Sequence, residues 1–136
     1  MTIDSALLDA VLGTLLPGEG AWPSAGALGL AGEVAGELGE DCARLLAALP
    51  PGFAALDAEA REDALRAIEA RHPAMFDRLV AAAYTAYYVD ARVRRTIERE
   101  TGYEDRPPQP LGYELEPFDE ALLERQRARQ PFWRRP

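Results

Sequence analysis

Two side chains in this sequence have the intrinsic chemistry of a catalytic group, His72 and Cys42, and each is the only residue of its type. An imidazole can serve as a general base, but His72 directly precedes Pro73 at an expected helix start, where a surface cap is its ordinary role. A thiol can serve as a nucleophile, but Cys42 falls in a stretch rich in Leu and Ala, where we expect a buried, unreactive thiol. Neither residue predicts an active site.

Acidic residues are the other candidates for chemistry, as metal ligands. The pairs Glu40-Asp41 and Glu62-Asp63 are adjacent in sequence, and adjacent positions on a helix point in different directions, so they do not converge well. A zinc site needs clustered Cys and His, and a phosphate-binding loop needs a Gly-rich turn after a strand. The sequence contains neither pattern. We expect no catalytic, cofactor-binding or metal-binding residue in the chain.

Aromatic residues interspersed with prolines distinguish the C-terminal part of the chain. A solvated tail contains few such residues, whereas aromatic side chains on a proline-stiffened segment lose little entropy when they dock on a surface. Trp, Tyr and Arg are also enriched at binding hot spots. Trp22 stands alone in a Gly- and Pro-rich loop, where it either folds back onto the core or contacts another molecule. The residues that we expect to contact a partner protein are Trp22, Pro107, Pro108, Pro110, Tyr113, Arg125, Arg129, Phe132, Trp133 and Arg134.

The elements that must position these residues are helices. Apolar residues make up 48% of the chain, and they are largely Ala and Leu, which favour helix over strand. We predict an all-α fold, a single small bundle of four to five helices with an irregular C-terminal arm rich in Pro and aromatic residues. Apolar spacings of three and four place the helices at residues 3–16, 27–49 with a break near Gly39, 57–69, and 73–97 with a break at 89–91.

Three tyrosines, Tyr84, Tyr87 and Tyr88, form the strongest aromatic stripe in these helices. Such rings could stack on a flavin or a nucleic-acid base. Aromatic residues at helical spacing are more typical of a core, so we expect these three to be buried. Their hydroxyl groups would then need hydrogen-bond partners.

Prolines and glycines after residue 100 divide the chain into a helical body, residues 1–100, and an arm, residues 101–136. One short helix is predicted in the arm from Phe118 to about Ala128, started by Pro117 or Asp119. We expect residues 103–118 to pack on the body and residues 125–136 to reach a partner. The alternative is that the whole arm packs on its own body.

The charge pattern excludes some partners. The net charge of −8 argues against nucleic acid, because phosphate binding needs a basic surface. Residues 125–136 nevertheless carry five arginines and no acidic residue. No apolar run approaches the roughly 18 residues of a membrane span, and no twin-arginine signal is seen in the N-terminal region. We therefore expect a cytoplasmic protein with no direct membrane insertion.

Short motifs along most of the chain resemble a known family, the small-subunit family of gluconate 2-dehydrogenase (subunit 3). Within this family, the chain looks most like the short bacterial members that accompany flavin-dependent oxidoreductases of the glucose–methanol–choline type. The block from Arg106 to Tyr113 is its most specific part. The matching motifs are Leu15-Leu16-Pro17, Trp22-Pro23-Ser24, Tyr84-x-x-Tyr87-Tyr88-x-Asp90, Gly102-Tyr103, Arg106-Pro107-Pro108-Gln109-Pro110-x-Gly112-Tyr113 and Trp133-Arg134.

The resemblance implies an accessory subunit without chemistry of its own. Such a subunit binds and stabilises a large FAD-carrying subunit that oxidises a sugar, a sugar acid or another alcohol. The FAD is expected in the partner and no cofactor in this chain. Two alternatives remain open: a helical adaptor or homo-oligomeric protein unrelated to redox chemistry, and a small stand-alone enzyme that uses His72.

Overall fold

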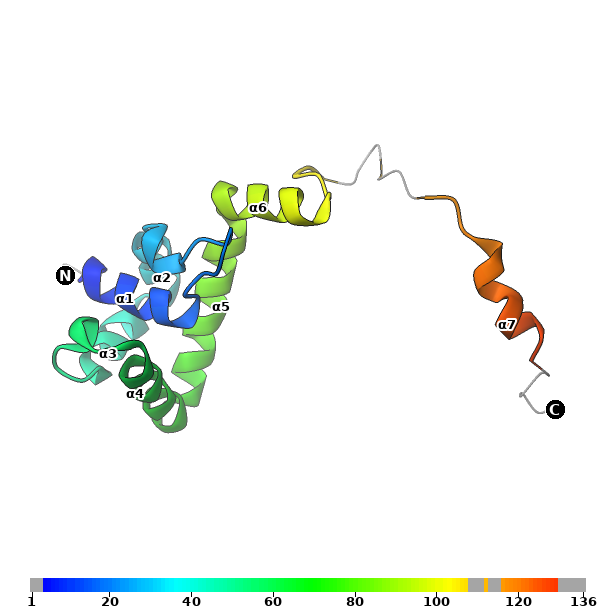
Figure 1. The fold of residues 1–136 in the computed structure, drawn as a ribbon. Helices are drawn as coiled ribbons and strands as arrows, with labels where there is room; N and C mark the ends of the chain where they lie inside the picture. The colour runs from blue at the N-terminus through cyan, green and yellow to red at the C-terminus, as the bar shows by residue number, and fades with distance from the viewer. Residues whose placement is uncertain (1–3, 108–111, 113–115, 130–136) are drawn as a thin grey trace. The chain divides into compact units, whose positions relative to one another are not determined.

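A computed structural model describes residues 4–107, 112 and 116–129 of the chain (Figure 1). Contacts divide the chain into two units, Met1–Asp105 and Arg106–Pro136. The described residues form seven α-helices and no β-strand, which confirms the predicted all-α class. Six of the predicted partner-binding residues lie outside the described part: Pro108, Pro110, Tyr113, Phe132, Trp133 and Arg134.

The first unit holds six of these helices, against the four to five predicted for the body. The difference arises because each of two long apolar stretches is divided into separate helices, at Gly39 and at Asp90. Their bounds are α1 Ser5–Leu15, α2 Ala31–Leu38, α3 Glu40–Ala48, α4 Ala58–Arg71, α5 Pro73–Val89 and α6 Ala91–Thr101, with short 3-10 turns η1 Ala25–Ala27 and η2 Phe53–Ala55.

Local capping chemistry explains several of these ends. Asp4, Asp57 and Asp90 are N-caps whose carboxylates accept a backbone N–H from the first turn of α1, α4 and α6. Gly39 separates α2 from α3 with φ of +57°, a conformation that favours glycine. The predicted start of the second stretch at residue 27 was four residues too early, because a 3-10 turn precedes α2.

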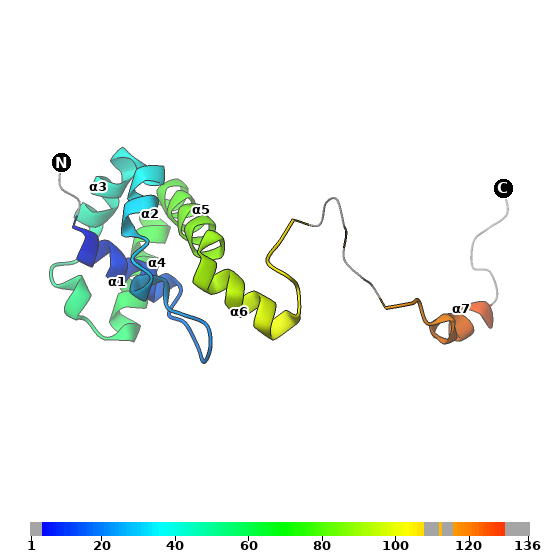
Figure 2. The ribbon, with the colours of Figure 1, turned by 90° about the horizontal axis from the view of Figure 1, so that it is seen from above.

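Two helices organise the packing of the first unit. α1 contacts η1, α2, α4 and η2, while α5 contacts α2, α4 and α6 (Figure 1 and Figure 2). Their buried side chains form one core. Members with no exposed surface include Leu8, Val11 and Leu12 of α1, Val34 of α2, Leu45 of α3, Ile68 of α4, Leu79 of α5 and Val93 of α6. None of the helices in the described residues is long and apolar enough to cross a membrane.

The second unit contains the short helix predicted in the arm. Asp119 is the N-cap, and its carboxylate accepts the N–H of Ala121 at 2.9 Å. The first turn is a 3-10 turn, η3 Glu120–Leu123, which leads into α7 Glu124–Arg127. Arg106 donates to the carbonyl of Gly112 at 2.8 Å within the same unit.

Candidate functional site

The two residues with catalytic side chains have different environments, since His72 is exposed and Cys42 is buried. His72 is exposed between α4 and α5, and its side chain makes no capping hydrogen bond; its backbone N–H donates to the Ile68 carbonyl at 2.8 Å. Cys42 has no exposed surface, and burial raises the pKa of its thiol. A raised pKa lowers the fraction of reactive thiolate. The described residues contain no group of three His, Cys, Asp or Glu side chains that could hold a metal ion.

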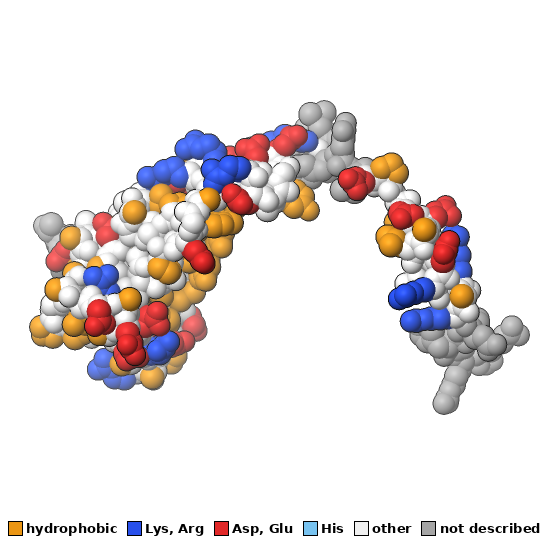
Figure 3. All heavy atoms as spheres, viewed as in Figure 1, with side chains coloured by type: hydrophobic (Ala, Val, Ile, Leu, Met, Phe, Trp, Pro, Cys, Tyr) orange, Lys and Arg blue, Asp and Glu red, His pale blue; other side chains and the backbone are white. Residues whose placement is uncertain are grey.

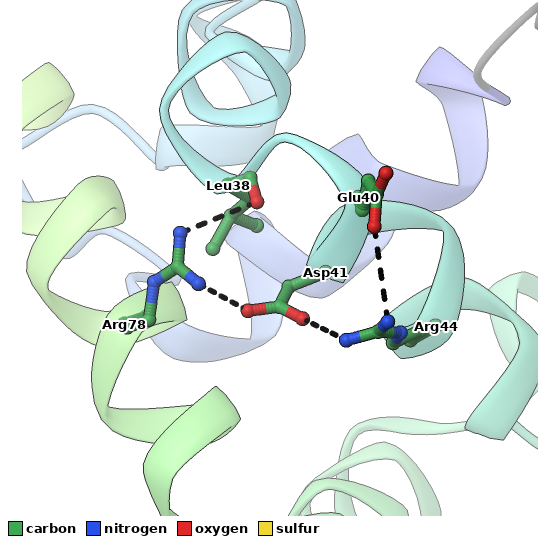
Figure 4. Close-up of polar contacts among 5 residues, drawn as sticks. All are labelled: Leu38, Glu40, Asp41, Arg44 and Arg78. Carbon is green, nitrogen blue, oxygen red and sulfur yellow. Dashed lines mark hydrogen bonds and ion pairs between the residues drawn. The ribbon is translucent and has the colours of Figure 1, made fainter.

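The Glu40-Asp41 pair is engaged by arginines (Figure 4). Arg44 donates to Asp41 at 3.0 Å and lies 3.8 Å from the Glu40 carboxylate. Arg78 of α5 forms an ion pair with Asp41 and donates to the Leu38 carbonyl at 3.4 Å. Arg44 thus lies beside both carboxylates of the pair. The ion pair of Asp41 with Arg78 links α3 to α5.

The three tyrosines of α5 do not share one environment, which corrects the prediction that all are buried. Tyr87 is in the core, and its hydroxyl donates to the Pro23 carbonyl at 2.8 Å. Burial, with a smaller contribution from Tyr88, raises the pKa of Tyr87. Tyr84 and Tyr88 are 45% and 46% exposed, and their rings stack with centroids 5.9 Å apart. These two rings and the exposed Ala81, at spacings of three and four, form what we call the tyrosine face.

This face belongs to a stretch of helix surface without charge. Residues 79–89 contain no charged side chain, although their members Ala81, Tyr84, Thr85, Tyr88 and Val89 are exposed. The exposed positions of α4 and α6 are instead mostly Glu, Asp and Arg. Figure 3 shows hydrophobic side chains gathered along the edge of the first unit that α5 forms. Depletion of charge with enrichment of Tyr is typical of the centre of a protein–protein interface.

A groove between α2 and α5 adjoins the tyrosine face. Its floor is apolar, with Leu30 from the start of α2 and Ala82, Ala86 and Val89 from α5. Glu33 and Glu37 line its α2 side, and Thr85 and Asp90 complete the lining. The hollow has a volume of about 280 Å³, smaller than the ~300–1,000 Å³ of sites that enclose a drug-sized ligand.

The segment between α1 and α2, which carries Trp22, is held against α5 and α6 by hydrogen bonds from three side chains. The Tyr87 hydroxyl donates to Pro23, Thr96 donates to the Ala21 carbonyl at 3.4 Å, and Arg92 donates to the Leu28 carbonyl at 2.8 Å. The Trp22 side chain is partly buried and packs against the core. Of the two alternatives for Trp22, the structure shows the ring folded back onto the core. A contact between Trp22 and a partner stays a prediction.

Asp90, at the junction of α5 and α6, provides a test of this local network. Arg92 donates to both carboxylate oxygens, at 3.0 and 2.7 Å. Chiefly through this hydrogen bonding, Arg92 lowers the pKa of Asp90 to about 2, below the ~3.9 of an unfolded Asp. The ionised carboxylate therefore stabilises the fold above about pH 4, and this contribution is lost as the pH falls toward 2.

We predict that Asp90→Asn lowers the free energy of unfolding at pH 7 by about 1 kcal/mol, since Arg92 is half-exposed and solvent screens part of the interaction. At pH 3 the difference from the unsubstituted protein should shrink by roughly half. Urea unfolding of both proteins at the two pH values measures it. An equal difference at pH 7 and pH 3 would contradict the assignment.

The remaining described members of the predicted partner-binding set, Pro107, Arg125 and Arg129, are exposed in the second unit. The sequence interpretation did not identify the groove residues or the tyrosine face as a binding surface. One signal was available: a run of eleven residues, 79–89, with no charge in a chain that is 28% charged.

No protein-family model, curated protein or solved structure matches the chain.

Proposed function

We propose that this chain is a non-catalytic accessory subunit that binds a larger flavin-dependent oxidoreductase. The partner carries the FAD and oxidises a sugar, a sugar acid or another alcohol, whereas this chain stabilises it. We place the complex in the cytoplasm, where a buried and unpaired thiol such as that of Cys42 stays reduced.

The tyrosine face is the observation that supports a binding role. Tyr84 and Tyr88 expose nearly half of their surface on a helix side that has no charge over three turns. Solvated helix surfaces ordinarily alternate acidic and basic residues, as α4 does. Tyrosine combines a large apolar area with a hydroxyl and few rotatable bonds, so it gains much on docking and loses little entropy.

The identity of the partner rests on a different observation. The motifs that resemble the gluconate 2-dehydrogenase small-subunit family include Tyr84 and Tyr88 on α5, Asp90 after its end, and the proline-rich block that begins at Arg106. The likeness therefore includes the exposed tyrosines of α5. A partner of this kind is a large flavoprotein, and the proposal extends to it on the strength of those motifs.

Co-expression tests the proposal. The chain is produced with an affinity tag together with a flavin-dependent oxidoreductase from the same genome, and the flavoprotein is also produced alone. We expect the two chains to co-purify in a fixed ratio with bound flavin, and the flavoprotein alone to lose solubility or activity. A flavoprotein that is soluble, fully active and unassociated in both preparations would refute the proposed function.

A further inference from the structure

The groove between α2 and α5 carries two acidic groups that have no partner. Glu33 and Glu37 are exposed, and within the described part of the chain neither forms an ion pair or a side-chain hydrogen bond. They are four residues apart on α2, so their side chains emerge one turn apart on the same side of the helix. The groove therefore combines an apolar floor with two carboxylates at a defined spacing.

A segment of the second unit, residues 118–129, has the complementary chemistry. Leu122 and Phe118 are 67% and 65% exposed. Arg125 and Arg129 are exposed, and their guanidinium groups have no partner among the described residues, whereas Arg127 pairs with Glu120 at 3.2 Å. Leu122 lies in the 3-10 turn η3, Arg125 lies in α7, and Arg129 lies two residues after the end of α7. Figure 3 shows basic and apolar side chains next to one another on this segment.

We propose that residues 118–129 of one copy of this chain bind in the α2–α5 groove of a second copy. Arg125 and Arg129 supply two positive charges for Glu33 and Glu37, and Leu122 provides the apolar side chain for the floor. Arginine is suited to this contact because its planar guanidinium pairs with carboxylates in two parallel hydrogen bonds. Reciprocal exchange fills both grooves of a dimer and so closes the assembly.

This inference does not rest on the proposed flavoprotein partner. The groove and the tyrosine face adjoin on α5 but share no residue, because Ala81, Tyr84 and Tyr88 are not part of the groove lining. The dimer contact can therefore be tested on the purified chain alone.

Analytical ultracentrifugation of the full-length chain over a range of concentrations tests the proposal. We expect a reversible dimer whose Kd rises with NaCl concentration, since salt screens exposed ion pairs. Leu122→Ala should raise the Kd roughly tenfold, by removing most of the buried apolar contact. A chain that stays monomeric at every concentration overturns the inference.

Charge exchange identifies the contacting surfaces. The groove variant Glu33→Arg/Glu37→Arg and the tail variant Arg125→Glu/Arg129→Glu each place like charges in the contact. We expect either variant alone to show a Kd increased by at least roughly 100-fold, because several attractive pairs become repulsive. In an equimolar mixture every contact between the two variants is again attractive, so a heterodimer should form.

A matched control, Glu59→Arg/Glu62→Arg, reverses the charge of two exposed acids on α4, outside the groove. Its Kd should stay within about twofold of that of the unsubstituted chain. Circular dichroism of each variant verifies that the helices are intact. Variants that do not associate when mixed, or a tail variant that dimerises as well as the unsubstituted chain, would place the contact elsewhere and overturn the inference.

Discussion

Replacing Gly26 by alanine is expected to destabilise the first unit by about 3 kcal/mol, the upper range for added atoms in a close-packed site. A Cβ atom at this position would overlap the carbonyl oxygen of Asp9 and lie 3.1 Å from both the Cα and the N of Gly13. All three are backbone atoms of α1, which cannot move aside as a flexible side chain can. The 3-10 turn η1 would have to separate from α1, which would loosen the buried side chains between them.

The control for this experiment is Gly32→Ala. Gly32 is inside α2, and a Cβ there meets no atom within 4 Å. Alanine has the higher helix propensity, so this variant should be stabilised by up to about 1 kcal/mol. Urea unfolding followed by circular dichroism measures both variants. If Gly26→Ala unfolds at the same urea concentration as the unsubstituted protein, the close contact between α1 and η1 at Gly26 is contradicted.

Charging the tyrosine face is expected to abolish binding of the proposed flavoprotein while the fold is preserved. Tyr84→Glu/Tyr88→Glu places two carboxylates at the centre of an uncharged surface, and each would lose its hydration on docking. Two aromatic contacts would also be lost. We expect the Kd for the partner to rise by at least roughly 100-fold, as for hot-spot residues. Both side chains are nearly half exposed, so the loss of stability should stay below about 1 kcal/mol.

The matched control adds the same two charges to another helix. Ala67→Glu/Ala70→Glu changes two exposed positions of α4 and should leave partner binding unchanged. Co-purification with the flavoprotein gives the binding readout, and thermal unfolding of the isolated chain gives the stability readout. Equal loss of partner binding in both variants would show that negative charge in general, and not the tyrosine face, weakens the complex.

Helix positions in this chain were predictable because their signals are local. The Asp side chains at 4, 57, 90 and 119 accept N–H groups only two or three residues away. Gly39 breaks a helix through its own backbone conformation. These interactions involve neighbours in sequence, so spacing and residue type are sufficient to infer them. The 3-10 turn before α2 was not predicted, because Ala25 and Leu28 are residue types that also favour an α-helix.

The candidate surfaces were not predictable in the same way. In the sequence, Glu33 and Glu37 look like ordinary exposed acids. Only the packing of α5 beside α2 makes them part of the lining of an apolar groove. The interpretation of the arm as a binding segment came from composition, and six of the nine partner-binding residues predicted in the arm lie outside the described part of the chain. The arm's contacts with its own body or a partner therefore stay predictions.

The sequence by itself determined the helical class, the breaks at Gly39 and near Asp90, and the lack of charge over residues 79–89. Only the tertiary structure decided which side of that stretch is covered. Helical periodicity places Tyr84, Tyr87 and Tyr88 on neighbouring sides of α5, but the packing of the loop at Pro23 buries Tyr87 and leaves the other two exposed. Gly26 is a second example. A side chain is excluded there by backbone atoms of α1 at Asp9 and Gly13, which are distant in sequence. The physical reason is that contacts between segments distant in sequence depend on how whole elements pack, which local spacing does not encode.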